Sequence, residues 1–186
     1  FFAFGTGANT NVLDIAVEAD GKILIVGEFT TVNGTPAPRA ARLNSDGSLD
    51  TATFGGFGSG ADNTINQVEL LSDGSIVVGG QFTSVAGVAN ARIARLNVDG
   101  SVDTATFTGL GSGPDNDVRA FAIQPGDGKI VIAGSFQNVN GTARNRIARL
   151  NTDGSLDLTF NPGIGPDAVV ESLAVSSGGS VYIGGL

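Results

Sequence analysis

The chain has 186 residues, which is enough for one domain with its own hydrophobic core. Its ten basic and eighteen acidic residues give a net charge of −8, which disfavours binding to nucleic-acid phosphates and to anionic membranes. Cys and His are absent, so the sequence excludes a disulfide framework, a Cys or His zinc site, and a nucleophile activated by His.

An internal repeat of about 53 residues runs along the chain. Asp20-Gly21-Lys22-Ile23 recurs as Asp73-Gly74-Ser75-Ile76, as Asp127-Gly128-Lys129-Ile130 and, in altered form, as Gly178-Gly179-Ser180-Val181. The repeat divides the chain into approximate units at residues 1–54, 55–107, 108–160 and 161–186, of which the last is incomplete. We therefore expect a single repeat domain or a fragment of a larger one.

Each unit is predicted to contain four short strands. The first strand is expected at residues 12–17, 65–70, 118–123 and 170–175, and the second at 22–26, 75–78 and 129–133. The Asp-Gly pair between them predicts a tight hairpin with a type I′ turn. The third strand is expected at 39–44, 92–97 and 146–151, and a second Asp-Gly turn leads to a brief fourth strand near Leu49, Val102 and Leu156. No stretch shows a sustained period of 3.6 residues, so we expect no helix.

The second strand indicates how the units pack. It is apolar on both faces over Ile23 to Val26, which is typical of a sheet that is covered on both sides. Radial stacking of four-stranded units gives such cover. The predicted fold is therefore all-β, with propeller-like repeats, four antiparallel strands per blade and about 3.5 blades. The longest aliphatic run is these four residues, so no membrane insertion is expected.

Several recurring motifs resemble one known family. They are Asp-Gly-Lys-Ile-Leu-Ile-Val-Gly-Glu-Phe-Thr at 20–30, Val-Asn-Gly-Thr at 32–35 and 139–142, Arg-Ile-Ala-Arg-Leu-Asn at 146–151 and Asp-Gly-Ser-Leu-Asp at 153–157. Together they resemble the bacterial delta-60 repeat family of large secreted or cell-surface proteins. The resemblance implies a propeller-like fold and an extracellular, secreted or cell-surface setting in bacteria. It carries no catalytic motif onto this chain.

The second Asp-Gly turn has two interpretations. Its side-chain oxygens at alternate positions are typical of a calcium loop. The residues concerned are Asn44, Asp46, Asp50, Asn97, Asp99, Asp103, Asn151, Asp153 and Asp157. An arginine stands two residues before each Asn, where an integrin-type calcium loop has an acid, and a guanidinium repels a cation and can bind the carboxylates itself. We therefore favour a structural turn braced by Arg and Asp, with no cofactor, and keep calcium as the alternative.

Other recurring residues are interpreted structurally. The arginine pairs Arg39/Arg42, Arg92/Arg95 and Arg146/Arg149 are three residues apart on the expected third strand, so they should point to opposite faces and form no basic patch. One arginine of each pair is expected to brace neighbouring blades. Candidate acids such as Asp14 and Glu69 differ between units, so no catalytic pair is predicted, and we expect no enzyme activity.

The topology predicts where a partner would bind. Short Asp-Gly turns should lie at one edge of the blades and the long connections at the other, where binding loops usually lie. The polar candidates on the long connections are Asp62, Asn63, Asp115, Asn116, Arg144 and Asn145. The predicted function is a non-enzymatic scaffold or adhesion module that contacts proteins or itself. One alternative is a glycan- or peptide-binding propeller, and another is a self-assembling fibre or surface-lattice subunit.

Overall fold

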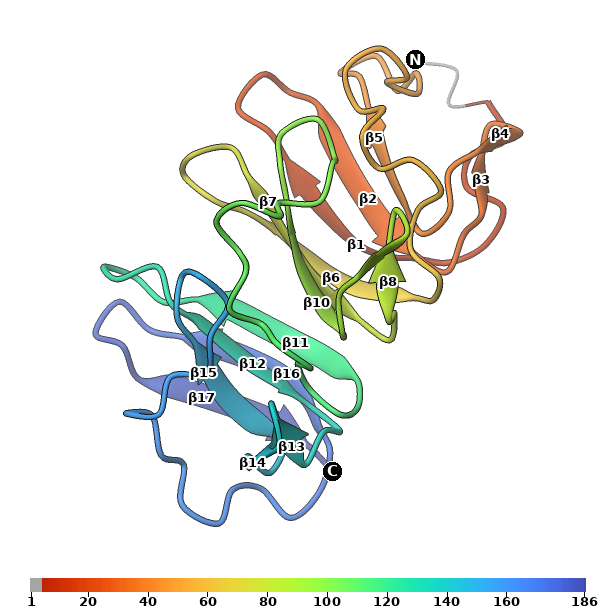
Figure 1. The fold of residues 1–186 in the computed structure, drawn as a ribbon. Helices are drawn as coiled ribbons and strands as arrows, with labels where there is room; N and C mark the ends of the chain where they lie inside the picture. The colour runs from red at the N-terminus through yellow and green to blue at the C-terminus, as the bar shows by residue number, and fades with distance from the viewer. Residues whose placement is uncertain (1–4) are drawn as a thin grey trace.

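A computed structural model describes residues 5–186 of the chain (Figure 1). The described residues form β-strands and turns with no helix, and every strand pair is antiparallel. The predicted all-β fold is therefore confirmed. The expected unit at 1–54 includes Phe1 to Phe4, which lie outside the described residues.

Four equivalent strands begin the units, at the positions that the sequence predicts. They are β1 (Val12–Val17), β6 (Ile65–Leu70), β11 (Val118–Ile123) and β16 (Val170–Val175). Each pairs with a second strand that is nearly all apolar. These second strands are β2 (Ile23–Gly27), β7 (Ile76–Gly80), β12 (Ile130–Gly134) and β17 (Val181–Gly185).

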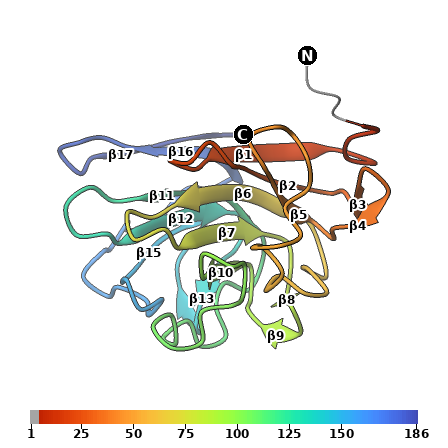
Figure 2. The ribbon, with the colours of Figure 1, turned by 90° about the horizontal axis from the view of Figure 1, so that it is seen from above.

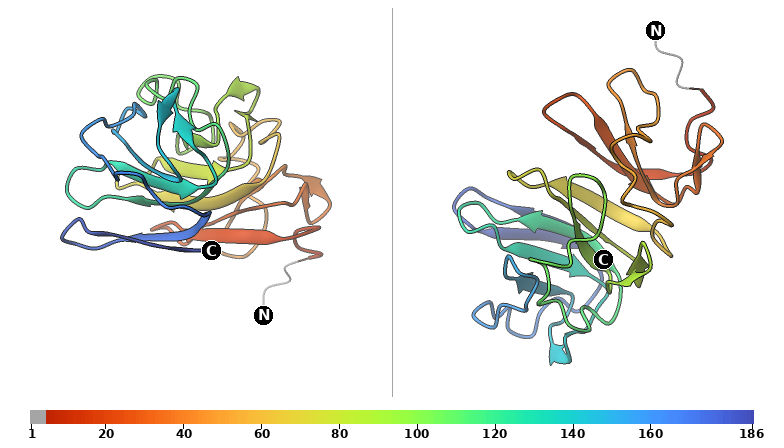
Figure 3. Two further views of the ribbon diagram at one scale, coloured as in Figure 1. Left: turned by 90° about the horizontal axis from the view of Figure 1, so that it is seen from below. Right: turned by 45° about the horizontal axis from the view of Figure 1, so that its top comes forward.

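A third strand completes the sheet of each of the first three units. These strands are β5 (Ala40–Leu43), β10 (Ile93–Leu96) and β15 (Ile147–Leu150). The brief fourth strand is a single bridge in each unit, and it joins Leu43 to Leu49, Leu96 to Val102 and Leu150 to Leu156. Figure 3 shows the sheets fanned out as successive blades, and Figure 2 shows β1 and β16 along one side of the molecule.

A small hairpin that the sequence analysis did not predict projects from each of the first three units. The hairpins are β3 (Thr31–Val32) with β4 (Thr35–Pro36), β8 (Ser84–Val85) with β9 (Val88–Ala89), and β13 (Asn138–Val139) with β14 (Thr142–Ala143). Their two-residue tips have positive φ at both positions, for example 51° at Asn33 and 76° at Gly34. This is the conformation of a type I′ turn.

The Asp-Gly hairpins differ from the prediction. Gly21 has a φ of 84°, but Asp20 is not in the left-handed region. The amide of Gly21 donates to the carbonyl of Glu18, and the amide of Glu18 donates to the carbonyl of Lys22. The loop therefore has three residues, a type I turn followed by a left-handed glycine, because a type I turn can be completed by one glycine that forms a bulge.

The start of the third strand also differs from the prediction. Arg39, Arg92 and Arg146 precede the strands instead of beginning them, and their φ values of 74°, 67° and 60° are left-handed. The amide of Arg39 donates to Phe29 and its carbonyl accepts from Gly27, so the residue forms a bulge at the sheet edge. The prediction that both arginines of each pair lie on the third strand was therefore wrong.

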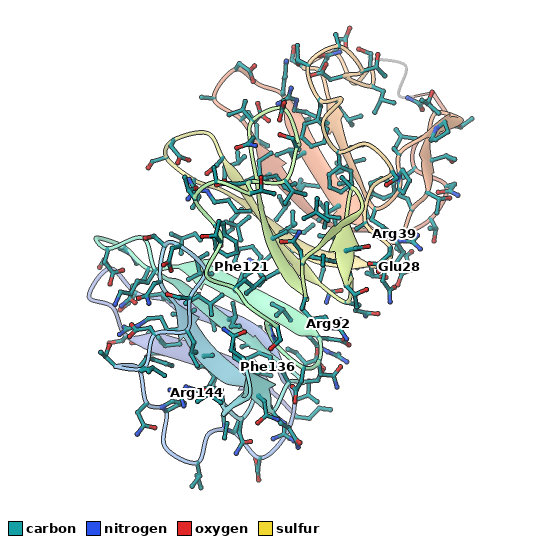
Figure 4. The ribbon with its side chains drawn as sticks, viewed as in Figure 1. Glu28, Arg39, Arg92, Phe121, Phe136 and Arg144 are labelled. Carbon is teal, nitrogen blue, oxygen red and sulfur yellow. The ribbon has the colours of Figure 1, made fainter. Side chains whose placement is uncertain are left out.

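The core lies between the blades. Leu24 and Val26 of the first unit pack with Val68, Ile76 and Val78 of the second. A second cluster joins Val77 and Ile93 to Phe121, Ile130 and Ile132 of the third unit. Alternate residues of one strand therefore face opposite neighbours, which explains why the second strands are apolar throughout. Figure 4 shows Phe121 and Phe136, both buried, among the side chains of the third unit.

A glycine ends each second strand because the neighbouring backbone leaves no room for a side chain. The ladder between β11 and β12 has a bulge between Val118 and Ala120. A Cβ atom on Gly134 would lie 2.0 Å from the carbonyl oxygen of Asp117. Gly27, Gly80 and Gly185 meet the same obstacle, at 2.2, 2.2 and 2.1 Å.

Side chains also connect neighbouring units by hydrogen bonds. Asp14 accepts from the amide of Val68 at 2.9 Å, and Gln67 both accepts from and donates to the backbone of Phe121. Arg42 donates to the carbonyl of Val98 at 2.8 Å. The expected brace between blades is thus present for Arg42.

The connection between units is held against the next Asp-Gly turn. The amide of Gly56 donates to the carbonyl of Asp99 at 2.9 Å, and Gly109 repeats this contact with Asp153 at 2.8 Å. The ring of Phe54 lies against Gly100, where an added Cβ would come within 2.9 Å of it. The glycines of this connection therefore serve close packing between units.

Candidate functional site

The strand directions define two opposite edges of the molecule. Since β1, β2 and β5 run antiparallel, both Asp-Gly turns of a unit lie at one end of its sheet. We call this end, with its six turns from Asp20 to Gly154, the turn edge. The other end carries the three small hairpins, which the connections between units reach at Ala61 and Pro114, and we call it the hairpin edge. In Figure 1 β3 and β4 lie at the upper right, β8 to the right of centre and β13 and β14 at the bottom, whereas the turns lie at the upper left of each sheet.

At the turn edge, the exposed aspartates bind their own turns. Asp46 accepts from the amide of Ser48 at 2.9 Å and from its hydroxyl at 2.6 Å. These hydrogen bonds lower the pKa of Asp46. Asn44 donates to the same hydroxyl at 2.9 Å. The equivalent contacts in the other units involve Asp99 with Ser101 and Asp153 with Ser155, at the same distances.

The second aspartate of the motif is buried against a lysine and an arginine in the first and third units. Asp50 accepts from Arg42 Nε at 3.0 Å and from Lys22 Nζ at 3.1 Å, and its exposed fraction is 5%. Burial alone would raise the pKa of Asp50, but the hydrogen bonds from Thr53, Lys22 and Arg42 outweigh it and lower the pKa well below its usual range. The Arg42 guanidinium also lies 4.9 Å from the centre of the Phe54 ring.

The third unit repeats this arrangement. Asp157 accepts from Lys129 Nζ and from Arg149 Nε, both at 2.8 Å. The hydrogen bonds from Lys129 and Thr159 lower the pKa of Asp157 strongly. A calcium ion at these motifs would have to compete with the bound cations. Among residues 5–186, no three acidic side chains gather in a geometry that could hold a metal ion. Calcium at the nine residues named above stays a hypothesis, to be tested by chelation.

The second unit departs from the other two at one position. Ser75 stands where the first and third units have Lys22 and Lys129. Arg95 turns toward Asp73, with Nη2 at 2.5 Å from the carboxylate, and its Nε donates to Ser75 at 3.0 Å. Its Nε is 3.5 Å from Asp103, too poorly placed for a hydrogen bond. Asp103 keeps the backbone amides of Ala105 and Thr106 as donors, but it lacks the lysine and the arginine hydrogen bond that Asp50 and Asp157 have.

At the hairpin edge, two of the candidate binding residues hold the hairpins in place. Asp62 accepts from the amides of Thr83 and Ser84 at 2.8 and 3.1 Å. Asp115 accepts from the amides of Gln137 and Asn138 at the same distances. Burial alone would raise the pKa of both carboxyl groups. The hydrogen bonds, chiefly from Thr83 to Asp62 and from Asn138 to Asp115, outweigh burial and lower the pKa of each.

The sequence analysis missed a third residue with this role. Asn9 accepts from the amides of Thr30 and Thr31 at 2.9 and 3.1 Å. It lies one repeat length before Asp62, and an amide oxygen serves here in place of a carboxylate oxygen. The sequence did indicate this role, because Asn9 and Asp62 occupy the same position of the repeat, but the change of residue type from Asn to Asp obscured it.

The remaining candidates are distributed along the hairpin edge and do not form one cluster. Asn63 and Asn116 each accept from the next backbone amide, at 2.8 and 2.9 Å. Asn145 donates to the carbonyl of Ile164 at 2.7 Å, and Arg144 donates to Ala143 at 2.8 Å. Figure 4 shows Arg39, Arg92 and Arg144 spaced along this edge.

The turn edge carries open cavities between the units. One of about 450 Å³ lies between the first Asp-Gly turns of the second and third units and includes Asp73, Arg95 and Gln124 in its lining. A second of about 470 Å³ lies beside it, and its lining includes Asp73, Ser75, Arg95, Asp99, Asp103 and Thr106. Arg95 therefore stands between two cavities, at the position where the repeat is broken.

The family of the chain follows from a match to a known repeat. The family model described as "Domain of unknown function (DUF5122) beta-propeller" matches residues 18–52, 71–105 and 126–160, more than half of the chain. The chain belongs to this family of propeller repeats. Each match runs from the first Asp-Gly turn to the brief fourth strand of one unit. No match was found among curated proteins.

Solved structures show the same fold. The WD40 β-propeller domain of Doa1 aligns with a TM-score of 0.60 and 17% identity over 94% of this chain and 48% of that one. The extracellular domain of the putative hybrid two-component system BT3049 from B. thetaiotaomicron aligns at 0.57, with 18% identity over 96% of this chain and 21% of that one. Virginiamycin B lyase from Staphylococcus aureus aligns at 0.52, with 19% identity over 94% and 48%.

These likenesses establish a propeller-type fold and nothing finer. The chain spans half or less of the length of each neighbour. One neighbour is named as a lyase and another as an extracellular domain, and these names describe those proteins. No helix among residues 5–186 could cross a membrane.

Proposed function

We propose that the chain is a non-enzymatic interaction module of a bacterial protein that acts outside the cell, as a scaffold or in adhesion. The delta-60-like motifs and the extracellular domain among the structural neighbours support the setting. The recurring carboxylates support a non-catalytic role, because Asp46, Asp50, Asp62 and their equivalents bind turns, hairpins and cations of the chain itself.

The hairpin edge is the proposed contact surface, and one observation carries this proposal. The three hairpins have the same backbone, with positive φ at both tip residues in each. Their exposed residues nevertheless differ: Thr35 and Pro36 in the first, Val88 and Ala89 in the second, and Ala143 in the third. Constant backbone with varied side chains is how loops on a rigid scaffold produce binding specificity.

The proposed ligands of this edge are a protein, or a peptide or glycan segment. The candidates Asn63, Asn116, Arg144 and Asn145 supply polar groups beside the hairpins. Asp62 and Asp115 contribute indirectly, because their hydrogen bonds hold the hairpins that carry the exposed tips. Binding here would use direct contacts to the tips, with no cofactor.

The test is binding of labelled protein to arrays of peptides and glycans. The variant Val88→Ser with Ala89→Ser changes the exposed strand β9 of one hairpin, and Val98→Ser, at an exposed residue of the turn edge, is the matched control. We expect signals of the unaltered protein to persist in the control and to fall at least tenfold in the hairpin variant. Signals that survive the hairpin change and disappear in the control would reject the hairpin edge.

Self-association is a second candidate, favoured by exposed apolar residues of the first unit. Ile15 is 58% exposed, whereas Val68, its equivalent in the second unit, is 3% exposed because the first unit covers it. Val17 is similarly exposed at 61%. Sedimentation velocity over a hundredfold range of concentration tests this candidate. A single concentration-independent species of the mass of one chain would exclude it.

A further inference from the structure

The second unit has an open cavity beside the repeat position at which the first and third units have a lysine. In the first unit, the ammonium group of Lys22 donates to Asp50 Oδ2 at 3.1 Å and to Thr53 Oγ1 at 3.0 Å. In the third unit, Lys129 donates to Asp157 Oδ2 at 2.8 Å. The equivalent aspartates Asp50 and Asp157 thus each bind a primary ammonium group within one chain.

Ser75 takes this position in the second unit and leaves the acceptors in place. Asp103 is the equivalent of Asp50, and Thr106 is the equivalent of Thr53. Asp103 is only 7% exposed, and its Oδ2 accepts a hydrogen bond from Thr106 alone. Both residues line the adjoining cavity of about 470 Å³, which is wide enough for an alkylammonium chain.

The charges of the second unit favour a cation in this cavity. Asp73, Asp99 and Asp103 line it together with a single base, Arg95. Arg95 lies 2.5 Å from Asp73 and forms a longer ion pair with Asp103, at 3.5 Å from its Nε, compared with 3.0 Å between Arg42 and Asp50. The cavity lining holds two more negative than positive groups, and a buried carboxylate that lacks the ammonium group of its equivalents binds a charged donor strongly.

We propose that this cavity, which we name the ammonium site, binds a primary ammonium group such as the side chain of a lysine in a partner. Asp103 Oδ2 and Thr106 Oγ1 accept its hydrogen bonds, as Asp50 and Thr53 do for Lys22. The site lies on the turn edge and the proposed contact surface lies on the hairpin edge. The failure of one proposal therefore leaves the other intact.

Two variants that exchange residues between units test the site. Ser75→Lys places in the second unit the residue that the first and third units already accommodate. Lys129→Ser removes the ammonium group from Asp157 in the third unit, where Arg149 and Thr159 still donate to the carboxylate. Both changes suit the local backbone, since each residue already occurs at this repeat position.

The measurement is an NMR titration of the 186-residue chain with n-butylammonium, with amide shifts read at residues 75, 103 and 106. We expect saturable shifts in the unaltered protein, at least a tenfold weaker response in Ser75→Lys, and a second saturable site near residue 157 in Lys129→Ser. Tetramethylammonium, which has the same charge but no N–H donor, is the control and should produce no saturable shift.

A third titrant separates the sources of the ammonium group. A short peptide with one central lysine and blocked ends should bind more tightly than n-butylammonium if a partner protein supplies the group, and equally if a free amine does. Shifts that never saturate, that spread over all acidic turns, or that persist unchanged in Ser75→Lys would overturn the proposal.

Discussion

The turn edge and the hairpin edge are built from the same repeat, with different use of side chains. At the turn edge Asp46, Asp99 and Asp153 bind the serine two residues later at identical distances, 2.9 Å to the amide and 2.6 Å to the hydroxyl. At the hairpin edge the backbone is repeated, but the exposed residues of the hairpin strands after the tips change from unit to unit.

The difference separates residues that form the fold from residues that are free to bind. A side chain that recurs with the same partner is required by its own turn or sheet. The positions where the repeat changes side chain while keeping its backbone are therefore the first places to search for contacts. By this criterion Ser75 stands out at the turn edge, because it replaces the lysine that donates to the buried carboxylate in the other two units.

The largest predicted effect comes from comparing two glycines, one at which a side chain would clash with backbone and one that only needs a positive φ. Gly134→Ala should destabilise the chain by about 3 kcal/mol or prevent folding, because the new Cβ would lie 2.0 Å from a backbone oxygen. Gly141→Ala, at a hairpin tip with φ of 71° and nothing within 4 Å, should cost only about 1 kcal/mol. Urea denaturation of both variants gives the difference, and equal losses would contradict this account.

The buried carboxylates of the turn edge should differ between units. Asp50→Asn leaves Arg42, which is 2% exposed, without its nearest counter-charge, and should cost about 3 kcal/mol. Asp103→Asn should cost clearly less, because neither Arg95 nor a lysine donates to this group. Thermal unfolding measures both. An equal loss in the two variants would show that Ser75 makes no difference to the second unit.

Acid should destabilise the fold by protonating the hydrogen-bonded aspartates together. The hydrogen-bonded aspartates have lowered pKa values in the folded chain, so their contribution to stability is present above the unfolded pKa of about 4. It is lost as the pH falls through the folded values. We expect the melting temperature to fall steeply below pH 4 and less steeply in Asp50→Asn, which lacks one of these groups.

Glu69 should act in the opposite direction. Burial, with a smaller contribution from the charge of Asp14, raises the pKa of Glu69 in the seam between the second and third units. Its folded state favours the protonated form, so stability is lost as the pH rises through the folded pKa. Glu69→Gln should raise the melting temperature slightly at pH 7 and leave it unchanged near pH 3. The amide oxygen of Gln can still accept from Ile123.

The smallest expected effect concerns calcium. If the Ser, Arg and Lys contacts hold the Asp-Gly turns, addition of a chelator should shift the melting temperature by less than about 1 °C. A larger fall that added calcium reverses would establish the calcium alternative at Asp46, Asp50 and their equivalents. Asp46→Asn would then show where the ion binds, because it changes an exposed ligand and leaves the buried ion pair in place.

The sequence predicted the long-range order of this fold better than its irregular parts. The first strands were predicted at their observed limits, because their apolar residues recur at the same positions in every unit. The small hairpins were missed because each strand has two residues, too few for a hydrophobic period. Their turns were visible as Asn-Gly at residues 33 and 140, but the second unit has Ala86-Gly87 in their place.

The site residues show the same limit. Asp62 and Asp115 were correctly placed on the connections between units, but their hydrogen bonds to hairpins about twenty residues later depend on the folded chain. The sequence shows that Ser75 stands where the other units have a lysine. That this lysine contacts Asp50 could not be predicted, because no local pattern specifies the distance between Lys22 and Asp50.

The contact between each connection and the next Asp-Gly turn has a consequence for how the chain folds. Gly56 and Phe54 are held by Asp99 and Gly100, more than forty residues later, so the first unit gains its last contacts only when the second has formed. Gly109 and Asp153 repeat this dependence. In an array with such nearest-neighbour coupling, the units should order together instead of one by one. During synthesis each blade would complete its contacts only after the next blade has left the ribosome.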